Sequence, residues 1–206
     1  MPKVLTAFHT PTKSRERGIS LVIVMMFLVI LSMLGVTALQ TSTLSSKVAR
    51  NQLDRTLAFQ AAEAALRDAE LDLKNKKFDK TTSCVAGATG CRAILISNRG
   101  QNFGNDTTGN PSANRCKLGL CATDNLIAGA PPFWEDRARW EKTNVDDSIT
   151  YGRFTGAANL PVVSQQPRYM IEFFQQGDDS VYRITAVGFG ASENTQIMLQ
   201  TAYKAL

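Results

Sequence analysis

The amino-acid sequence predicts an α+β protein. It has a long N-terminal helix whose first half crosses a membrane, packed on a C-terminal antiparallel β-sheet, with a long irregular region between them. Three observations predict this class: an apolar run without charge, a helix-forming segment after it, and three β-rich runs at the end of the chain. The expected organisation is a basic leader at residues 1–18, a membrane-spanning half-helix at 19–40, an amphipathic half-helix at 41–79 and a globular region at 80–206.

The apolar run carries no charged side chain between Gly18 and Ser46, and its core at residues 19–36 reads ISLVIVMMFLVILSMLGV. Eighteen helical residues extend about 27 Å, close to the hydrocarbon thickness of a bilayer. A buried core helix is rarely apolar on every face over this length. A secretory signal peptide has a shorter apolar region that ends in a small-residue cleavage site. The run is therefore predicted to be a retained membrane anchor.

The charges around the apolar run predict its orientation. Residues 1–18 contain four basic side chains and one acidic side chain, and positively charged flanks remain in the cytoplasm. The rest of the chain is then expected outside the inner membrane. Most of the net charge of +5 lies in this leader, so the chain lacks the concentrated basic face of a nucleic-acid-binding protein, and no nucleic-acid partner is expected.

Helix-forming residues continue after the apolar run to about Lys76. No proline occurs between Pro11 and Pro111, and residues 52–74 are rich in Ala, Leu, Glu and Arg. We expect one apolar stripe to pack on the same chain's globular region or on a neighbouring subunit, with Gly35 the weakest point of the helix. The stripe has spacings of three and four residues and consists of Phe59, Ala62, Leu66, Ala69 and Leu73.

The C-terminal region predicts a sheet. Periodicity fades at residues 80–165, which are rich in Gly, Asn, Thr and Pro. Three β-rich runs follow at residues 168–176, 180–190 and 195–205, and Gly-Asp-Asp at 177–179 is a hairpin signal between the first two. We expect an antiparallel sheet of at least three strands, on which the helical stripe can dock.

Four cysteines follow the membrane run, namely Cys84, Cys91, Cys116 and Cys121. An even number in an oxidising compartment favours disulfides. Three pairings are compatible with the sequence, including the local one that joins Cys84 to Cys91 and Cys116 to Cys121. A zinc site is the alternative, but four-thiolate sites prefer cysteines two to four residues apart, and only the second pair meets that spacing.

The sequence contains no recognisable catalytic set. Its single histidine, His9, lies in the basic leader, so the rest of the chain lacks the base of a Ser-His-Asp or Cys-His system and any histidine metal ligand. No P-loop, G-x-S-x-G or G-x-G-x-x-G motif occurs. We therefore expect no enzymatic activity, cofactor or metal.

Two further groups of residues have both a structural and a functional interpretation. Paired acids at 146–147 and 178–179 could hold calcium with backbone carbonyls, but such acids are more often solvated turn residues. Phe133, Trp134 and Trp140 could form a binding patch, although packing beneath a loop is the commoner role of such aromatic residues.

The order of these features resembles the type IV pilins: a short basic leader ending in glycine, an apolar segment and a continuing amphipathic helix. Similarity to the PilX-type minor pilins lies in four stretches, ERGISLVIVMMFLVILSMLGVTALQTSTL, RTLAFQAAEAALRDAE, YRITAVGFG and TQIMLQTAYKA. The resemblance implies a pilin-like fold, cleavage by a prepilin peptidase between Gly18 and Ile19, and N-methylation of Ile19. It covers the N-terminal third strongly and the last quarter moderately.

The resemblance also implies a role. The chain is expected to be a minor pilin that helps to initiate type IV pilus assembly by helix–helix packing. Its implied partners are other minor pilins, the major pilin, the inner-membrane assembly platform, the prepilin peptidase and a tip adhesin. It is expected first in the inner membrane, with its N-terminus cytoplasmic and its C-terminal domain periplasmic, and then in the fibre at the cell surface.

Ile23 departs from the family pattern. Most pilins have glutamate at the fifth mature residue, where it pairs with the N-terminal ammonium of the subunit ahead, and an unpaired carboxylate in hydrocarbon costs roughly 3 kcal/mol. A subunit with no subunit ahead of it needs no such pair. Ile23 therefore predicts a place at or near the fibre tip.

Other interpretations stay open at this point. A pseudopilin of a type II secretion system would share the fold and the missing glutamate. A membrane-anchored protein whose outer domain binds a ligand or a host surface would keep its leader and His9. An anchored enzyme is the least supported, because no catalytic set is visible.

Overall fold

The computed structural model describes residues 19–85, 88–92, 103, 116–122, 132–141, 143, 147–176 and 179–204, without the side chains of residues 38–42, 122, 175 and 176. Helix α1 runs from Ile19 to Leu73. The chain forms two structural units, Met1–Ala49 and Arg50–Leu206. The first unit contributes the N-terminal part of α1, and the second contains the rest of the helix and all of the β-sheet.

The C-terminal end of α1 is capped by its own backbone. Asn75 adopts a left-handed conformation with φ of 55°, which asparagine tolerates better than most residues. The Asn75 N–H donates to the Asp72 carbonyl at 2.9 Å, and the Lys76 N–H donates to the Leu71 carbonyl at 2.8 Å. This pair of bonds is a Schellman motif, and it ends the helix at Leu73, earlier than the sequence predicted.

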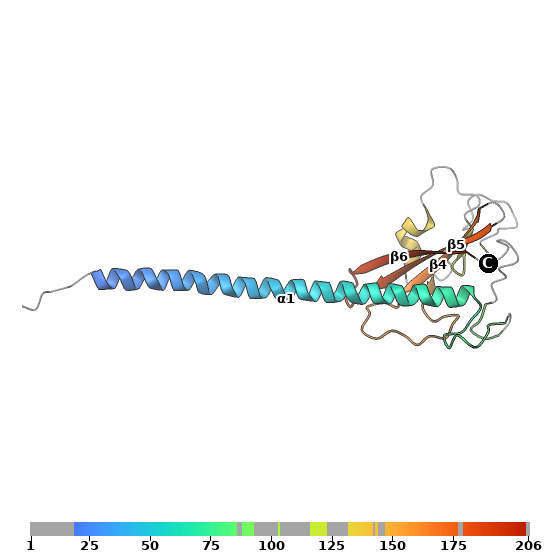
Figure 1. The fold of residues 1–206 in the computed structure, drawn as a ribbon, viewed down its shortest axis with the longest axis horizontal. Helices are drawn as coiled ribbons and strands as arrows, with labels where there is room; N and C mark the ends of the chain where they lie inside the picture. The colour runs from blue at the N-terminus through green and yellow to red at the C-terminus, as the bar shows by residue number, and fades with distance from the viewer. Residues whose placement is uncertain are drawn as a thin grey trace, which may run out of the picture. The chain divides into compact units, whose positions relative to one another are not determined.

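One six-stranded sheet follows the helix in the described part of the chain (Figure 1), in the order β1-β2-β4-β5-β6 with β3 paired to β4. The strands are β1 (Cys116–Lys117), β2 (Leu120–Ala122), β3 (Ile149–Thr150), β4 (Arg168–Gln176), β5 (Asp179–Phe189) and β6 (Gln196–Lys204).

The antiparallel sheet of at least three C-terminal strands that the sequence predicted is present, and it is extended by a parallel pair that the sequence did not predict. The strands β4, β5 and β6 are antiparallel neighbours, as predicted, but β2 pairs with β4 in parallel, so the sheet is mixed. The strands β1 and β2 are only two and three residues long. Strands of this length cannot show the period-two alternation from which a strand is predicted.

The two faces of the sheet carry separate cores, because successive side chains of a strand point to opposite faces. In β4, Tyr169, Ile171 and Phe173 belong to the cluster that contains α1 residues, whereas Met170 belongs to the second cluster. The first cluster comprises Ala65, Ala69, Leu73, Phe103, Leu120, Ile149, Phe154, Tyr169, Ile171, Phe173, Tyr182, Ile184 and Ala186. The second comprises Cys116, Cys121, Trp140, Met170, Val187 and Phe189.

The helix lies very close to β5. A Cβ atom placed on Gly188 would lie 2.1 Å from the Ala58 carbonyl oxygen and 2.3 Å from the Ala62 nitrogen. The neighbouring helix positions Ala61 and Ala65 are also buried alanines. Small side chains on both elements therefore allow the backbones to approach, and they fix the face of α1 that meets the sheet.

Candidate assembly interface

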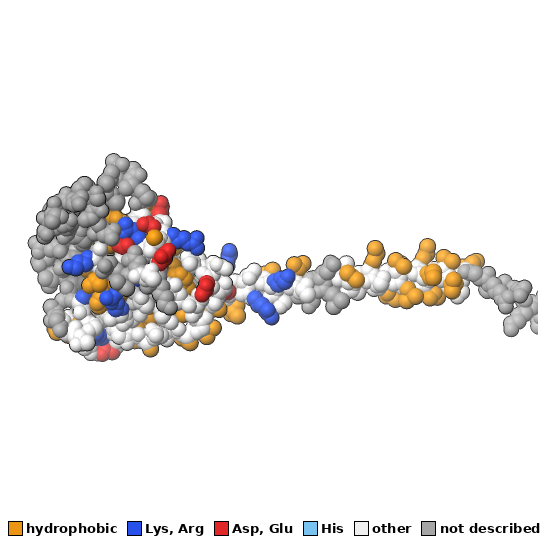
Figure 2. Space-filling model, turned by 180° about the vertical axis from the view of Figure 1, so that it is seen from behind, with side chains coloured by type: hydrophobic (Ala, Val, Ile, Leu, Met, Phe, Trp, Pro, Cys, Tyr) orange, Lys and Arg blue, Asp and Glu red, His pale blue; other side chains and the backbone are white. Residues whose placement is uncertain are grey.

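The N-terminal part of α1 exposes apolar side chains along its length (Figure 2). Residues Ile19–Thr37 have a mean hydropathy of 2.9 and are long and apolar enough to cross a membrane. The hydroxyl of Ser32 donates to the Val29 carbonyl at 2.8 Å, and that of Thr37 donates to the Leu34 carbonyl at 2.9 Å. The helix thus satisfies these hydroxyls itself, as surroundings of lipid or apolar helices require.

Ile19 is the first residue of α1, and Ile23 lies one helical turn further along it. Both side chains are exposed, Ile19 at 79% and Ile23 at 48%, so each presents an apolar surface. Gly18 lies outside the described residues.

The predicted apolar stripe divides between two roles. Ala62, Ala69 and Leu73 are completely buried in the unit that contains the sheet, and Leu66 packs against the same core while half-buried. Phe59 is 41% exposed. Of the two packing partners that the sequence left open, the chain's own sheet therefore contacts the alanines and Leu73, whereas Phe59 stays partly exposed.

Two carboxylates on the sheet-facing side of α1 were not foreseen. Asp68 and Asp72 are only 1% and 3% exposed, although charged residues on a helix are usually expected on its solvent side. They lie one turn apart and alternate with the buried residues Ala65, Ala69 and Leu73. That shared helical face was the one signal in the sequence that could have revealed their burial.

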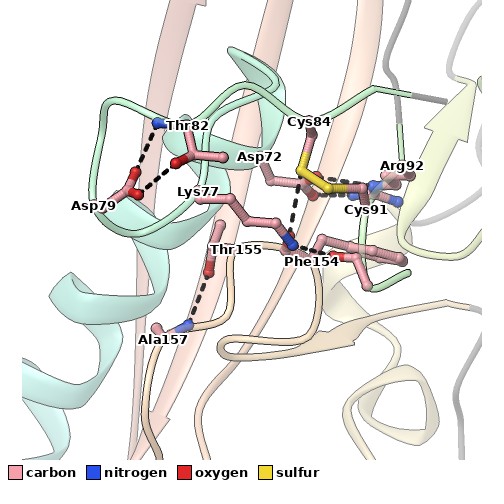
Figure 3. Close-up of a disulfide and its surroundings, with 11 residues drawn as sticks. Asp72, Lys77, Asp79, Thr82, Cys84, Cys91, Arg92, Phe154, Thr155 and Ala157 are labelled. Carbon is pink, nitrogen blue, oxygen red and sulfur yellow. Dashed lines mark hydrogen bonds and ion pairs between the residues drawn. A yellow bond between two sulfur atoms is a disulfide. The ribbon is translucent and has the colours of Figure 1, made fainter. Parts of the chain in front are cut away.

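The Asp72 carboxylate is held by an arginine and a tyrosine. The Nε atom of Arg92 donates to its two oxygens at 3.1 and 3.0 Å, and the Arg92 guanidinium forms an ion pair with it. The hydroxyl of Tyr169 donates to the same carboxylate at 2.8 Å. Arg92 also donates to the Leu118 carbonyl and lies 4.4 Å from the centroid of the Phe154 ring. Figure 3 shows Arg92 directed at Asp72 beside a disulfide.

Asp68 has a different environment: within the described part of the chain, the groups that donate hydrogen bonds to it are uncharged. The Gly152 N–H donates to its carboxylate at 2.7 Å, and the Thr155 hydroxyl donates to the other oxygen. Burial raises the pKa of Asp68 to about 6, against the opposing effect of these two hydrogen bonds. Asp72 raises this pKa further, whereas Arg92 lowers it.

Both disulfides join cysteines that are close in the sequence. Cys84 is bonded to Cys91, and Cys116 is bonded to Cys121, which is the local one of the three pairings. The first bond closes the segment after the helix, whereas the second links directly paired residues of β1 and β2. Within the described part of the chain, no three His, Cys, Asp or Glu residues are grouped as a metal site.

The aromatic residues near position 133 pack on the second face of the sheet. Trp140 is buried there with Met170, and Phe133 and Trp134 pack against the same cluster. The Trp140 Nε1 atom donates to the Trp134 carbonyl at 3.0 Å. These contacts fit packing beneath a loop.

Two of the four paired acids form ion pairs with basic side chains. Asp147 pairs with Arg139 at 3.0 Å, and Asp179 pairs with Lys204 at 2.7 Å. The other two predicted acids, Asp146 and Asp178, lie outside the described residues.

An exposed apolar N-terminal helix segment, followed by a helical segment packed on a β-sheet, is the arrangement of a pilin-like protein. Comparison with protein families supports this class in two parts of the sequence. The family described as PilX N-terminal matches residues 17–67. The family described as type IV pilus assembly protein PilX C-term matches residues 98–205, more than half of the chain. Neither the curated proteins nor the solved structures gave a match.

The chain belongs to the PilX family of type IV pilus assembly proteins. Pilins are structural components of a fibre, so the exposed surface of α1 is the first candidate for contacts with other subunits. The two family matches include all of the predicted strands and the helix up to Arg67. The disulfide between Cys84 and Cys91 lies between the two matched ranges.

Proposed function

We propose that this chain is a minor pilin that helps to initiate type IV pilus assembly and sits at or near the tip of the fibre. The observation that carries the proposal is the apolar side chain at Ile23, exposed on α1 one turn after Ile19. A subunit in the shaft needs a carboxylate there to pair with the terminal ammonium of the subunit ahead. A subunit with none ahead avoids the cost of burying that charge in hydrocarbon.

Assembly in this proposal proceeds by packing of helix surfaces. A prepilin peptidase cleaves between Gly18 and Ile19 and methylates Ile19, and the chain remains in the inner membrane with residues 41–206 in the periplasm. The exposed apolar side chains of Ile19–Thr37 then exchange lipid contacts for contacts with other minor pilins and the major pilin at the assembly platform. Phe59 adds exposed apolar surface further along the helix, whereas Ala62, Ala69 and Leu73 are already used by the domain.

The location is tested by labelling the native protein in sheared fibres. A tag at the C-terminus of the full-length chain, detected by immunogold, is expected at one end of each fibre. A tagged major pilin is the control and marks the whole shaft. Label distributed evenly along the shaft would contradict the tip position.

The processing step is tested separately by the mass of the N-terminal peptide from native membranes, with and without the prepilin peptidase. An N-methylated Ile19 that depends on the peptidase is the expected result. A chain that still begins near Met1 would favour a membrane-anchored binding protein. A pseudopilin of type II secretion would be processed in the same way, and the match to a type IV pilus assembly family favours the pilus over that machine.

A further inference from the structure

The last turns of α1 bring a carboxylate into the protein interior. Asp72 is 3% exposed and belongs to the helix face that carries Ala69 and Leu73 into the core. A buried carboxylate is strongly destabilising when its partner is lost, because the charge then lacks both water and a counterion. The helix end can therefore dock on the sheet only if a cation and hydrogen-bond donors meet Asp72 there.

Arg92 supplies that cation, and its position depends on a short segment of chain. It follows directly after Cys91, which is bonded to Cys84. Cys84 is in turn fixed to the end of the helix, because its N–H donates to the Asn75 carbonyl at 2.8 Å. The disulfide therefore bonds the residue before Arg92 covalently to a residue that is hydrogen-bonded to the cap of α1.

Weaker contacts hold the same segment (Figure 3). Lys77 donates through its Nζ atom to the carbonyls of Gly90 at 2.7 Å and Phe154 at 3.1 Å. Each is a single hydrogen bond from a flexible side chain, which loses conformational entropy when it is held. We do not expect these contacts to keep Arg92 in place once the covalent connection is opened.

We propose that the Cys84–Cys91 disulfide places Arg92 against Asp72, so that docking of the end of α1 on the sheet depends on oxidation of this one cysteine pair. Oxidation removes two electrons and two protons from the two thiols, and a protein disulfide accepts them by thiol–disulfide exchange and becomes a dithiol. The reduced chain leaves Arg92 on an open segment and Asp72 without its counterion. Only a chain that has reached an oxidising compartment then completes the packing of its helix.

The second disulfide provides a matched control. Cys116 and Cys121 face each other in an antiparallel pair that the backbone already forms. The two bonds span similar separations of seven and five residues, so the chain-entropy model gives them similar effects on the unfolded state. A larger and Asp72-dependent effect of the first bond would therefore report its action through Arg92.

The test is a mutant cycle on the full chain in detergent micelles, unfolded in urea. The fluorescence of Trp134 and Trp140, which are the two tryptophans of the chain, reports the domain. The double variant Cys84→Ala, Cys91→Ala is expected to raise the equilibrium constant for unfolding. This increase should be at least tenfold greater in the parent chain than in a chain that also carries Asp72→Asn. Cys116→Ala with Cys121→Ala is expected to have the same effect in both backgrounds. The proposal would be overturned if Asp72→Asn changed the effect of removing each disulfide by the same factor.

Two further variants complete the cycle. Arg92→Gln is expected to destabilise the oxidised protein and to add little once Cys84 and Cys91 are both alanine, because the two changes remove the same interaction. Full additivity would contradict the proposed positioning role. If the Cys84→Ala, Cys91→Ala chain does not fold, Asp72→Asn is expected to restore protease resistance, and failure to restore it overturns the proposal. The inference concerns folding of residues 50–206, so it stands or falls independently of the place of the chain in the fibre.

Discussion

The two parts of helix α1 use side-chain size in opposite ways. Along Ile19–Thr37 the helix exposes large apolar residues, whereas from Ala58 onwards it buries alanines and leaves the larger Phe59 41% exposed. Helix formation is common to both parts, so the difference lies in the partner. Lipid or other helices accept large side chains on every face, whereas β5 approaches so closely at Gly188 that only small residues fit opposite it.

The comparison shows that the hydrophobicity of a segment does not determine which part of α1 is buried. The first part has no buried side chain among the described residues 19–37, although it is the most apolar segment. The second part places Asp68 and Asp72 inside. Burial of this part of the helix also depends on close backbone approach at Gly188 and on polar partners for those carboxylates.

The largest expected effect comes from Gly188→Ala. The added Cβ atom would lie 2.1 Å from the carbonyl oxygen of Ala58, and neither backbone can move without opening the helix–sheet contact. We expect a loss of about 4 kcal/mol or more in the free energy of unfolding, measured by urea unfolding of the full chain in micelles. The control is Gly35→Ala, which meets no atom within 4 Å and should leave domain unfolding unchanged. If Gly188→Ala and Gly35→Ala reduced the free energy of unfolding equally, close helix–sheet packing would not distinguish the two parts of the helix.

The second-largest loss of stability is expected from a leucine-to-alanine change on the same helix. Leu73 is fully buried and Leu53 is 71% exposed. Leu73→Ala should cost about 3 kcal/mol, because it removes buried methyl groups and leaves a cavity, whereas Leu53→Ala should change stability by no more than about 0.5 kcal/mol. The same urea titration gives both values. A large loss from Leu53→Ala would mean that the domain uses a second helix face.

A pH-dependent effect is expected at Asp68. Its pKa is raised from 3.8 to about 6 in the folded protein, mainly by burial, so between about pH 4 and pH 6 the folded state binds more protons at this group than the unfolded state does. The contribution of Asp68 to stability is therefore greatest below pH 3.8 and decreases as the pH rises through about 6. The loss is up to about 3 kcal/mol.

Asp68→Asn removes this titration while it retains an oxygen that can accept from the Gly152 N–H. The difference in unfolding free energy between the parent and Asp68→Asn, measured from pH 4 to pH 8, should shift in favour of the variant as the pH rises. A difference that stays constant over this range would exclude Asp68 as the titrating group. Asp79→Asn is a control of opposite sign, because Asp79 is exposed and the hydrogen bonds that it accepts from Thr82 lower its pKa.

Local sequence patterns were sufficient to predict the long helix and the long strands. The bounds of β4, Arg168–Gln176, agree with the β-rich run in the sequence, because this run of nine residues is rich in the aromatic and β-branched side chains that favour strands. The helix was also foreseen, but its end was placed too late, since the left-handed conformation of Asn75 depends on the cap that forms around it.

Long-range pairings could not be predicted in this way. The parallel pairing of β2 with β4 joins Leu120 to Ile171, and nothing in a three-residue strand specifies such a partner. The contact between Asp72 and Arg92 also depends on the chain path beyond the helix, which passes through a disulfide. The sequence therefore identified three buried members of the helix stripe, Ala62, Ala69 and Leu73, but missed the two carboxylates that share their face.

The smallest expected effect is at Ile23, in the exposed apolar part of α1. Ile23→Glu introduces the glutamate that the resemblance to pilins implies for this position, and under the proposed tip location the subunit gains no ion pair from it. We expect the number of pili per cell to change by less than about twofold, because a carboxyl group in hydrocarbon takes up a proton and then carries no charge. Pili are counted by electron microscopy, with immunoblots for the level of the chain.

Ile23→Leu is the matched control, because it keeps an apolar side chain of the same size at the same place on α1. If Ile23→Glu abolished piliation at a normal protein level while Ile23→Leu did not, the apolar side chain itself would be required for assembly. The tip argument would then fail, because it treats Ile23 as a residue released from the need for a carboxylate. If both variants retain pili, the exposed surface of α1 at this position tolerates either residue, as expected for a subunit with no partner in front of it.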